Sequence, residues 1–271
     1  MSISIGVTGL AGWKIVQRIE PQQIEAVARD PIVLRATTYF QENIGRAGQA
    51  EDLVKDYRLM STALSAFGLE GDIANKAFIQ KILESDVADE SSLVNRLADK
   101  RYLRLAEAFG YGAPKPPADA SAVVDADAAA DAELARTVSN AFVQREFERR
   151  IGMSDENLRL ALNARREVQR LGGRDSSDRT LWFEIIGNTP LRKVFQGAFG
   201  FPESYGQLPV DRQLEEYTRA SERVLGSARF KEIATTEGID KLVQAFMVRS
   251  QLTAMPTTNR YTAALALLTG N

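Results

Sequence analysis

The chain has 271 residues, of which 44% are hydrophobic and 26% charged, and its 34 basic and 36 acidic residues give a formal charge of −2. This length suits one large or two ordinary domains, and the apolar content is sufficient for a folded core. The near-zero net charge gives no general excess of cations for a nucleic-acid backbone or an anionic membrane. We therefore expect no nucleic-acid partner.

Cysteine and histidine are both absent from the sequence. The first absence excludes disulfides, thiolate nucleophiles and zinc–thiolate clusters, and the second excludes the commonest general base and transition-metal ligand. Carboxylates remain available, but adjacent acids such as Glu215 and Glu216 point about 100° apart on a helix and form no prepared pair. We expect no enzyme, no cofactor and no metal site, with a carboxylate-dependent hydrolase as the remaining catalytic alternative.

No window approaches the roughly 20 apolar residues that a membrane-spanning helix needs, so we expect no membrane insertion. The first residues also lack a basic stretch followed by an apolar core. We expect no cleaved signal peptide, which leaves open a cytoplasmic location or export by a route that reads an uncleaved terminus.

The opening sequence SISIGVTGLAGWKIV could belong to a nucleotide-binding fold. Its glycines, Gly6, Gly9 and Gly12, have the spacing G-x-x-G-x-x-G, whereas the dinucleotide fingerprint is G-x-G-x-x-G. Ile15 stands where the related T-G-x-x-G-x-x-G pattern needs its last glycine, and no second strand follows to build a parallel sheet. We interpret this segment as a close-packing N-terminus anchored by Trp13.

Helix signals predominate in the rest of the chain. Asp30-Pro31 and Thr189-Pro190 each place a capping residue before a proline, as expected where a helix begins. Apolar residues recur at helical spacing in two segments: Val33, Ala36, Phe40 and Ile44, and then Ile239, Leu242, Val243, Phe246 and Met247. Further helices are expected near 21–29, 55–67, 72–84, 91–98, 100–109, 132–151, 155–171, 178–186, 210–225, 228–235 and 258–268.

Between Gly110 and Asp131 the composition changes to proline, alanine and aspartate, with almost no large apolar residue. Such a segment buries too little surface to offset its ordering entropy. We therefore expect an all-α fold of two helical halves, with an N-terminal domain at 1–112, a flexible linker at 113–131 and a C-terminal domain at 132–271. A long loop within one domain is the alternative.

Two motifs recur on both sides of this linker. Three predicted helices end in Ala-Phe-Gly, at Phe67-Gly68, Phe109-Gly110 and Phe199-Gly200; glycine after the last turn suits a left-handed C-cap, so we interpret these pairs as structural. The segments NKAFIQKILE at 75–84 and SNAFVQREFE at 139–148 are also alike. The halves thus contain partly repeated helix-pair motifs, although the spacing establishes no regular repeat.

The predicted helix at 132–151 has two apolar faces. Leu134, Val138, Ala141 and Phe142 form one face, and Val143, Phe147 and Ile151 form the other. Either the helix lies in the middle of its own domain, or one face contacts a partner or another subunit. Val138, Phe142, Val143, Phe147 and Ile151 are therefore our partner-contact candidates, and a homo-oligomer is one form that the contact can take.

Arginines are frequent between 145 and 174, but glutamates and aspartates are interspersed among them. This mixture is typical of a solvated helix face with local ion pairs rather than of a nucleic-acid surface.

Read together, DYRLMSTALSAFGLEGDIANKAFIQKILESD (56–86), SLVNRLADKRYLRLAEAFGYG (92–112) and DENLRLALNARREV (155–168) resemble the bacterial domain-of-unknown-function family 1217. DPIVLRATTYFQENI (30–44) resembles the beginning of the same family. The resemblance implies an all-helical fold, and it implies a flagellar context, because members are typically encoded beside flagellar genes in alphaproteobacteria. It assigns no catalytic residue.

We therefore expect a non-enzymatic, flagellum-associated interaction protein: an assembly factor, an export-linked helper or a minor structural component. The resemblance implies a flagellar or export-apparatus protein as its partner, and a cytoplasmic or flagellum-associated location. The alternative is a small-molecule or nucleotide-binding regulator with a pocket between the helical halves.

Overall fold

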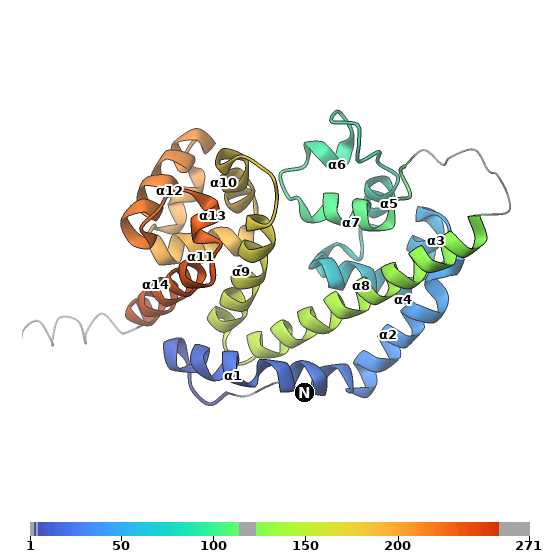
Figure 1. Cartoon of the computed structure of the whole chain (residues 1–271), viewed down its shortest axis with the longest axis horizontal. Coiled ribbons are helices and arrows are strands. Elements are labelled where there is room, and N and C mark those ends of the chain that lie inside the picture. The colour runs from blue at the N-terminus through green and yellow to red at the C-terminus, as the bar shows by residue number, and fades with distance from the viewer. Residues whose placement is uncertain (1–2, 4, 114–122, 255–271) are drawn as a thin grey trace, which may run out of the picture. The chain divides into compact units, whose positions relative to one another are not determined.

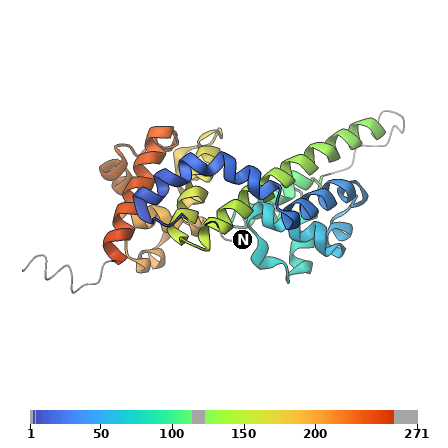
Figure 2. The same ribbon diagram turned by 90° about the horizontal axis from the view of Figure 1, so that it is seen from below.

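The computed structural model describes residues 3, 5–113 and 123–254, and these residues form helices and connecting segments without any strand (Figures 1 and 2). The prediction of an all-α fold is confirmed. The helix predicted near 258–268 lies outside the described residues.

The chain divides into two compact units. Unit 1 consists of Met1–Arg18 and Arg150–Asn271, and unit 2 consists of Ile19–Arg149. Both boundaries fall inside helices, namely α1 (Gly9–Ala28) and α8 (Val123–Gly152). Unit 2 is therefore an insertion in the sequence of unit 1.

These units differ from the predicted division at residues 113–131. Ala135 and Val138, in α8, are buried in the core of unit 2, so this part of the helix groups with the preceding residues. The helix also begins earlier than predicted, and residues 123–131 of the expected linker are helical. Alanine has the highest helix propensity, and this alanine-rich stretch follows it despite the nearby prolines. The other linker residues, 114–122, lie outside the described residues.

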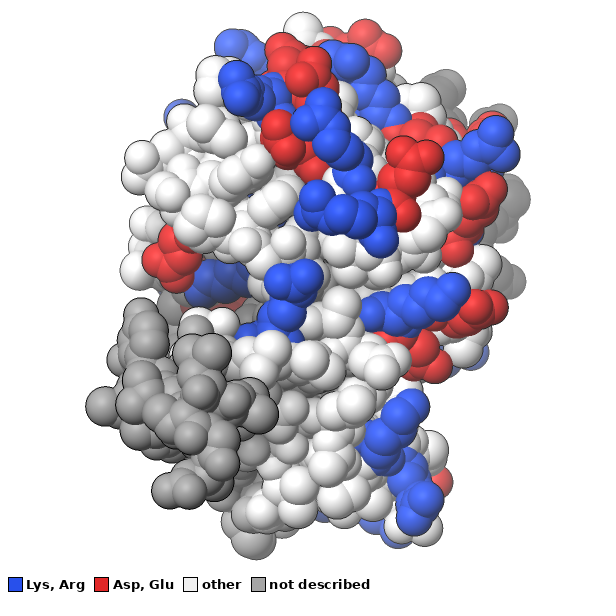
Figure 3. All heavy atoms as spheres, turned by 90° about the vertical axis from the view of Figure 1, so that its left-hand side faces the viewer, with Lys and Arg blue, Asp and Glu red and all other residues white. Residues whose placement is uncertain are grey.

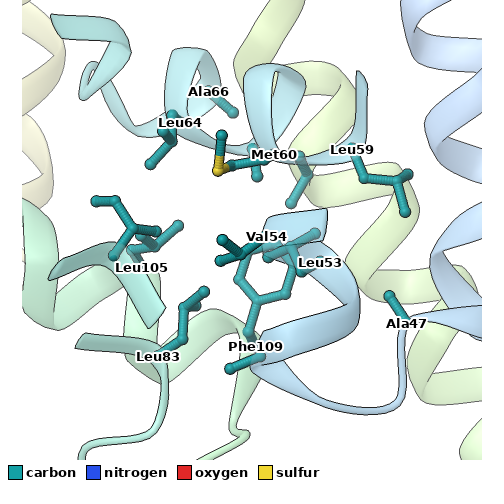
Figure 4. Packing of buried hydrophobic residues seen from close by; sticks show 14 of the residues in the cluster. Ala47, Leu53, Val54, Leu59, Met60, Leu64, Ala66, Leu83, Leu105 and Phe109 are labelled. Atoms are coloured by element: carbon teal, nitrogen blue, oxygen red, sulfur yellow. The ribbon is translucent and has the colours of Figure 1, made fainter. Parts of the chain in front are cut away.

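Unit 2 contains six helices between the parts of α1 and α8 that belong to it within the described residues: α2 (Pro31–Asn43), α3 (Ala50–Lys55), α4 (Tyr57–Phe67), α5 (Lys76–Leu83), α6 (Leu93–Arg96) and α7 (Arg101–Phe109). Short 3₁₀ turns, η1 (Ile44–Arg46) and η2 (Glu70–Asp72), follow α2 and α4. The core lies where α3, α4, α5 and α7 meet. Figure 4 shows Val54 of α3, Met60 of α4, Leu83 of α5 and Phe109 of α7 converging there.

Local capping explains where the helices of unit 2 begin. Asp30 accepts a hydrogen bond from the backbone amide of Ile32 (2.9 Å), and Pro31 is the first residue of α2, as predicted. Asp56 caps α4 in the same way by accepting from the amides of Arg58 and Leu59. A carboxylate at this position satisfies amides that have no partner within the helix.

Unit 1 adds six helices to its parts of α1 and α8 within the described residues: α9 (Glu156–Gly172), α10 (Asp178–Gly187), α11 (Thr189–Phe199), α12 (Val210–Leu225), α13 (Phe230–Ile233) and α14 (Thr236–Ala254). The 3₁₀ turn η3 (Glu203–Gln207) joins α11 to α12. α14 packs against α11 and α9 (Figures 1 and 2). Its apolar stripe faces the core, because all five predicted residues from Ile239 to Met247 are buried.

The start of α11 corrects one predicted cap. Asn188, rather than Thr189, is the N-cap, and its Oδ1 accepts from the amide of Leu191 (3.2 Å). Thr189 is therefore the first helical residue and Pro190 the second. Asparagine is at least as good a cap as threonine, so the helix gains its cap one residue earlier.

Candidate functional site

The opening glycines are explained by packing within unit 1. Gly9 has a φ of +64°, which favours glycine. A Cβ on Gly12 would lie 2.3 Å from the carbonyl oxygen of Val7 and 3.3 Å from a methyl carbon of Leu158. Gly12 therefore allows the first turn of α1 to approach the preceding chain and α9.

The described residues contain no parallel sheet behind this turn. Thr8 precedes the first residue of α1, and Trp13, one turn later, is buried with the guanidinium of Arg165 5.4 Å from its ring centroid. Trp13 thus lies where an anchor for this segment was expected. The glycines serve a helix-to-helix contact here, without the strand that a dinucleotide-binding turn requires.

The structure buries three of the five partner-contact candidates. Val138, Phe147 and Ile151 are fully buried, whereas Phe142 and Val143 are half-buried. Val138 and Phe142 belong to or pack against the core of unit 2. The apolar faces of α8 are therefore largely covered within the chain, and a free partner surface has to be sought elsewhere.

The three Ala-Phe-Gly segments lie at the ends of α4, α7 and α11. Each phenylalanine, Phe67, Phe109 or Phe199, is the last helical residue. The glycine after it has positive φ: 72° at Gly68, 61° at Gly110 and 76° at Gly200. All three glycines form left-handed caps, and Phe109 and Phe199 are buried. These residues shape helix ends, as the sequence predicts.

Arginines of α8 and α9 pair with carboxylates on the same helices. Arg149 lies 2.7 Å from Glu146, and the buried Glu167 accepts from Arg166 at 2.6 Å and from Arg170 at 3.2 Å. These pairs direct guanidinium groups toward neighbouring carboxylates, as the sequence pattern predicts.

The described residues contain no group of three or more acidic side chains placed to hold a metal ion. Among the same residues, no helix is long and apolar enough to cross a membrane. The carboxylates of Glu215 and Glu216 lie on α12, where Arg219 pairs with Glu216 at 3.4 Å.

Two adjoining helices of unit 2, α2 and α4, carry exposed apolar side chains that we together call the α2–α4 patch. Ile32 (70% exposed) and Leu34 (51%) lie on either side of the solvent-facing surface of α2, and Tyr57 (60%) lies at the start of α4. Beside it, a hollow of about 410 Å³ is lined by Leu34, Arg35, Thr38, Tyr39, Glu42 and Arg58. The guanidinium of Arg58 stacks 3.6 Å above the ring of Tyr39. The patch thus adjoins a hollow that carries two arginines and one carboxylate, that of Glu42.

Sequence reasoning missed this patch because it followed the buried stripe of α2. Ile32 and Leu34 flank Val33, which is buried, and therefore project away from the core. Their position off the stripe is the signal that could have identified them.

Unit 1 has a larger open groove between α11 and the end of α14, with a volume of about 740 Å³. We call it the α11–α14 groove; its lining residues are Asn157, Gly197, Gly200, Phe201, Pro202, Arg249, Ser250, Leu252 and Thr253. Figure 3 views the left-hand side of Figure 1: acidic and basic side chains are interspersed over its upper part, and the described surface of its lower part is mostly uncharged with some basic side chains. Among the described residues that line the groove, Arg249 alone is charged.

A smaller pocket of about 360 Å³ adjoins the first turns of α1 and α9. Thr8 and Gly9 line it, together with Asp155 and Glu156. Asp155 already accepts from the amides of Asn157 and Leu158 and so occupies the N-terminus of α9. A phosphate would meet these carboxylates, which makes the pocket unfavourable for an anion.

The structure defines an all-α protein of two helical units, without a strand in its described residues. The crystal structure of a protein from Agrobacterium tumefaciens, a target of the Northeast Structural Genomics Consortium, is similar to it with a TM-score of 0.73 and 24% identity, over 94% of this chain and 97% of that chain. This likeness concerns the fold. No curated protein matches the chain.

The family model described as "Protein of unknown function (DUF1217)" matches residues 66–239. The chain belongs to this family. The resemblance carried by segments 56–86, 92–112 and 155–168 is thereby confirmed.

Proposed function

We propose that the chain is a non-enzymatic interaction protein of the flagellar system, acting as an assembly factor, an export-linked helper or a minor structural component. Its flagellar context rests on the family resemblance, since members are typically encoded beside flagellar genes. The interaction role rests on the distribution of side chains: the arginines and glutamates of α8 and α9 pair with one another, whereas apolar side chains are exposed on unit 2.

One observation carries the interaction role, namely the α2–α4 patch. Ile32, Leu34 and Tyr57 are each at least half exposed on helices that pack against each other. Covering apolar area of this kind is the main favourable term in protein association, and an aromatic residue beside arginine is typical of interface centres.

The charged neighbours of the patch indicate the chemistry of the partner. Arg35 lines the adjoining hollow with its side chain exposed, and Arg58 holds its guanidinium against the ring of Tyr39. A flagellar protein that presents apolar side chains flanked by carboxylates would satisfy both features.

The experiment is affinity capture from cells that are building flagella, with the full-length chain and two variants as bait. Ile32→Glu places a charge in the patch near the N-terminus of α2, where a carboxylate is tolerated. Val210→Glu is the control, because Val210 is an exposed apolar residue at the start of α12. We expect the parent and V210E to recover the same flagellar or export component and I32E to lose it at least about tenfold, which equals about 1.4 kcal/mol.

Two outcomes contradict the proposal. Recovery of no flagellar or export component, together with normal swimming of a deletion strain, removes the flagellar role. Equal recovery with the parent and I32E removes the α2–α4 patch as the contact.

A small-molecule or nucleotide-binding regulator is the second candidate, because Thr8 and Gly9 line the 360 Å³ pocket of unit 1. Asp155 and Glu156 in the same lining oppose the phosphates of a nucleotide and favour an uncharged small molecule. A ligand that binds only the folded chain raises its melting temperature. Stabilisation by a nucleotide that is lost in Thr8→Val would favour this function, whereas absence of any shift would leave the interaction role preferred.

A further inference from the structure

We propose that an ordered water molecule binds at a closed polar site in unit 1, beneath the 3₁₀ turn η3, where it bonds to Gln196, Gln213 and Tyr217. This inference does not depend on the α2–α4 patch or on the flagellar role. It gives a ligand to three buried polar atoms to which no other partner is assigned.

The first reason is the burial of these three side chains. Tyr217 is fully buried, Gln213 is 4% exposed and Gln196 is 9% exposed. The hydroxyl of Tyr217, Nε2 of Gln196 and Oε1 of Gln213 are all closed off from solvent, and no group of the described residues forms a hydrogen bond with them. Leaving such atoms unbonded destabilises a fold, so in folded proteins they nearly always bond to protein or to ordered water.

The second reason is that the three side chains meet in one place. α11 supplies Gln196, and α12, which packs against α11, supplies Gln213 and Tyr217. Gln213 and Tyr217 are four residues apart and therefore lie on one face of their helix. Burial raises the pKa of the Tyr217 hydroxyl, and the nearby Arg192 guanidinium and Gln196 amide partly counter this rise, which places that amide beside the hydroxyl.

The third reason is the position of η3, which has no buried residue of its own. Nε2 of Gln213 donates to the carbonyl oxygens of Gly206 at 3.3 Å and Leu208 at 2.6 Å. A Cβ on Gly206 would lie 3.9 Å from Nε2 of Gln196. The turn therefore lies close to both glutamines, and the site suits a ligand of the size of water rather than an organic molecule.

The donors and acceptors of the site match those of one water molecule. Oε1 of Gln213 must face away from the two carbonyl oxygens that its amide nitrogen binds, so it offers an acceptor to the site. Nε2 of Gln196 offers a donor, and the hydroxyl of Tyr217 can do either. Water accepts from Gln196, donates to Gln213 and pairs with Tyr217, which gives the three hydrogen bonds that are typical of buried water.

A crystal structure of the full-length protein, at a resolution that shows ordered water, tests the site directly. We expect a water peak within about 2.7–3.2 Å of all three polar atoms. The proposal is overturned by an empty site, by direct bonds among the three side chains, by a side chain turned into solvent, or by a larger molecule in place of water.

Thermal unfolding tests the site in solution. If water bonds to these groups, Tyr217→Phe and Gln196→Met each remove a hydrogen bond and should lower Tm by about 2–4 °C. If the atoms have no partner, their removal relieves a desolvation cost, and an unchanged or raised Tm overturns the proposal. Tyr57→Phe and Gln244→Met are matched controls with exposed side chains, and neither should change Tm.

The double variant Y217F/Q196M tests whether the two side chains share their ligand. We expect it to lower Tm by less than the sum of the two single losses, because both substitutions remove bonds to the same water. Additive losses overturn the shared site, and the crystal structure separates a shared water from a direct bond. Capture experiments with I32E address unit 2, so this proposal and the proposed function fail separately.

Discussion

Tyr39 donates its hydroxyl proton to Oδ2 of Asp56 at a distance of 2.6 Å, and this bond joins α2 to the residue that caps α4. Oδ1 of the same carboxylate accepts from the amides of Arg58 and Leu59. Partial burial opposes ionisation of Asp56, but the hydrogen bonds from Tyr39 and the two amides outweigh it and lower its pKa below the ordinary 3.8. One carboxylate thus holds two helices of unit 2 together.

We expect Asp56→Ala to lower the free energy of unfolding by about 1–2 kcal/mol at pH 7, because a cap and a side-chain bond are lost together. Since the pKa is lower in the folded state, the carboxylate stabilises the fold above about pH 4, and this contribution disappears as the pH falls through the lowered value. Urea unfolding at pH 7 and pH 3 measures both effects, and the penalty of D56A should shrink at pH 3. Tyr39→Phe, which removes one bond and keeps the cap, should cost less than D56A; an equal cost would contradict this assignment.

We expect Gly12→Ala to destabilise the chain by about 2 kcal/mol or more, although alanine is about 1 kcal/mol better than glycine within a helix. The added Cβ would lie 2.3 Å from the carbonyl oxygen of Val7, which is backbone and cannot turn away. Gly173→Ala is the control in unit 1, because its Cβ would meet nothing closer than 3.6 Å. Thermal unfolding of both variants gives the comparison, and a neutral G12A would show that the helix start adjusts.

The glycines that form left-handed caps have different surroundings, so substitutions at two of them distinguish backbone strain from a steric clash. At Gly110 a Cβ would meet nothing within 4 Å, whereas at Gly200 it would lie 2.6 Å from a guanidinium nitrogen of Arg249. We expect Gly110→Ala to cost about 1 kcal/mol from its positive φ alone, with partial rescue in Gly110→Asn. Gly200→Ala should lower the free energy of unfolding by at least as much and should also displace the side chain of Arg249. Thermal unfolding followed by circular dichroism measures the first effect, and hydrogen exchange near Arg249 measures the second. A stabilising G110A would contradict the strain argument.

Glu167 is 1% exposed and accepts from Arg166 and Arg170. We expect Glu167→Ala to cost roughly 2–3 kcal/mol, somewhat less than a fully buried pair, because both arginines retain access to water. Glu156→Ala removes an exposed partner of Arg159 on the same helix and should stay within about 1 kcal/mol. Guanidinium unfolding of the two variants checks the contrast; similar losses would mean that burial does not distinguish them.

Substitutions of Phe147 and Ile32 distinguish a residue of the folded core from a residue of a binding surface. Phe147 is fully buried, so Phe147→Ala should cost about 3–5 kcal/mol and lower the amount of folded chain. Ile32→Glu should leave the free energy of unfolding within about 0.5 kcal/mol. Circular dichroism melts of both variants decide this. A stable F147A that fails in capture would return the partner surface to α8.

Features that depend on neighbours in sequence were predictable. Asp30-Pro31 predicts the start of α2, because the capping carboxylate and the fixed φ of proline both act locally. The glycines after Phe67, Phe109 and Phe199 predict helix ends, because a left-handed cap is also a local feature. The apolar stripe from Ile239 to Met247 correctly identifies the buried side of α14.

Features that depend on distant contacts were not predictable. A helix was expected only from residue 21, yet α1 runs from Gly9 through Pro21 to Ala28. Trp13 and Val16 in its first half are buried, and the free energy gained by this burial offsets the cost of the helical hydrogen bond that Pro21 removes. Likewise, the two apolar faces of α8 predicted that the helix needs cover on both sides, but periodicity cannot tell whether its own chain or a partner provides that cover.

The insertion of unit 2 within unit 1 sets an order of events during translation. Residues 19–149 are complete while the chain that follows still takes on the order of ten seconds to emerge. Until α9 and then α14 have been synthesised, the first turns of α1 lack the helices they pack against, and Trp13 and Val16 remain exposed to water. The nascent polypeptide therefore exposes apolar side chains of its N-terminal helix while unit 2 is already complete. A ribosome that stalls at this stage releases an incomplete chain that chaperones are expected to bind.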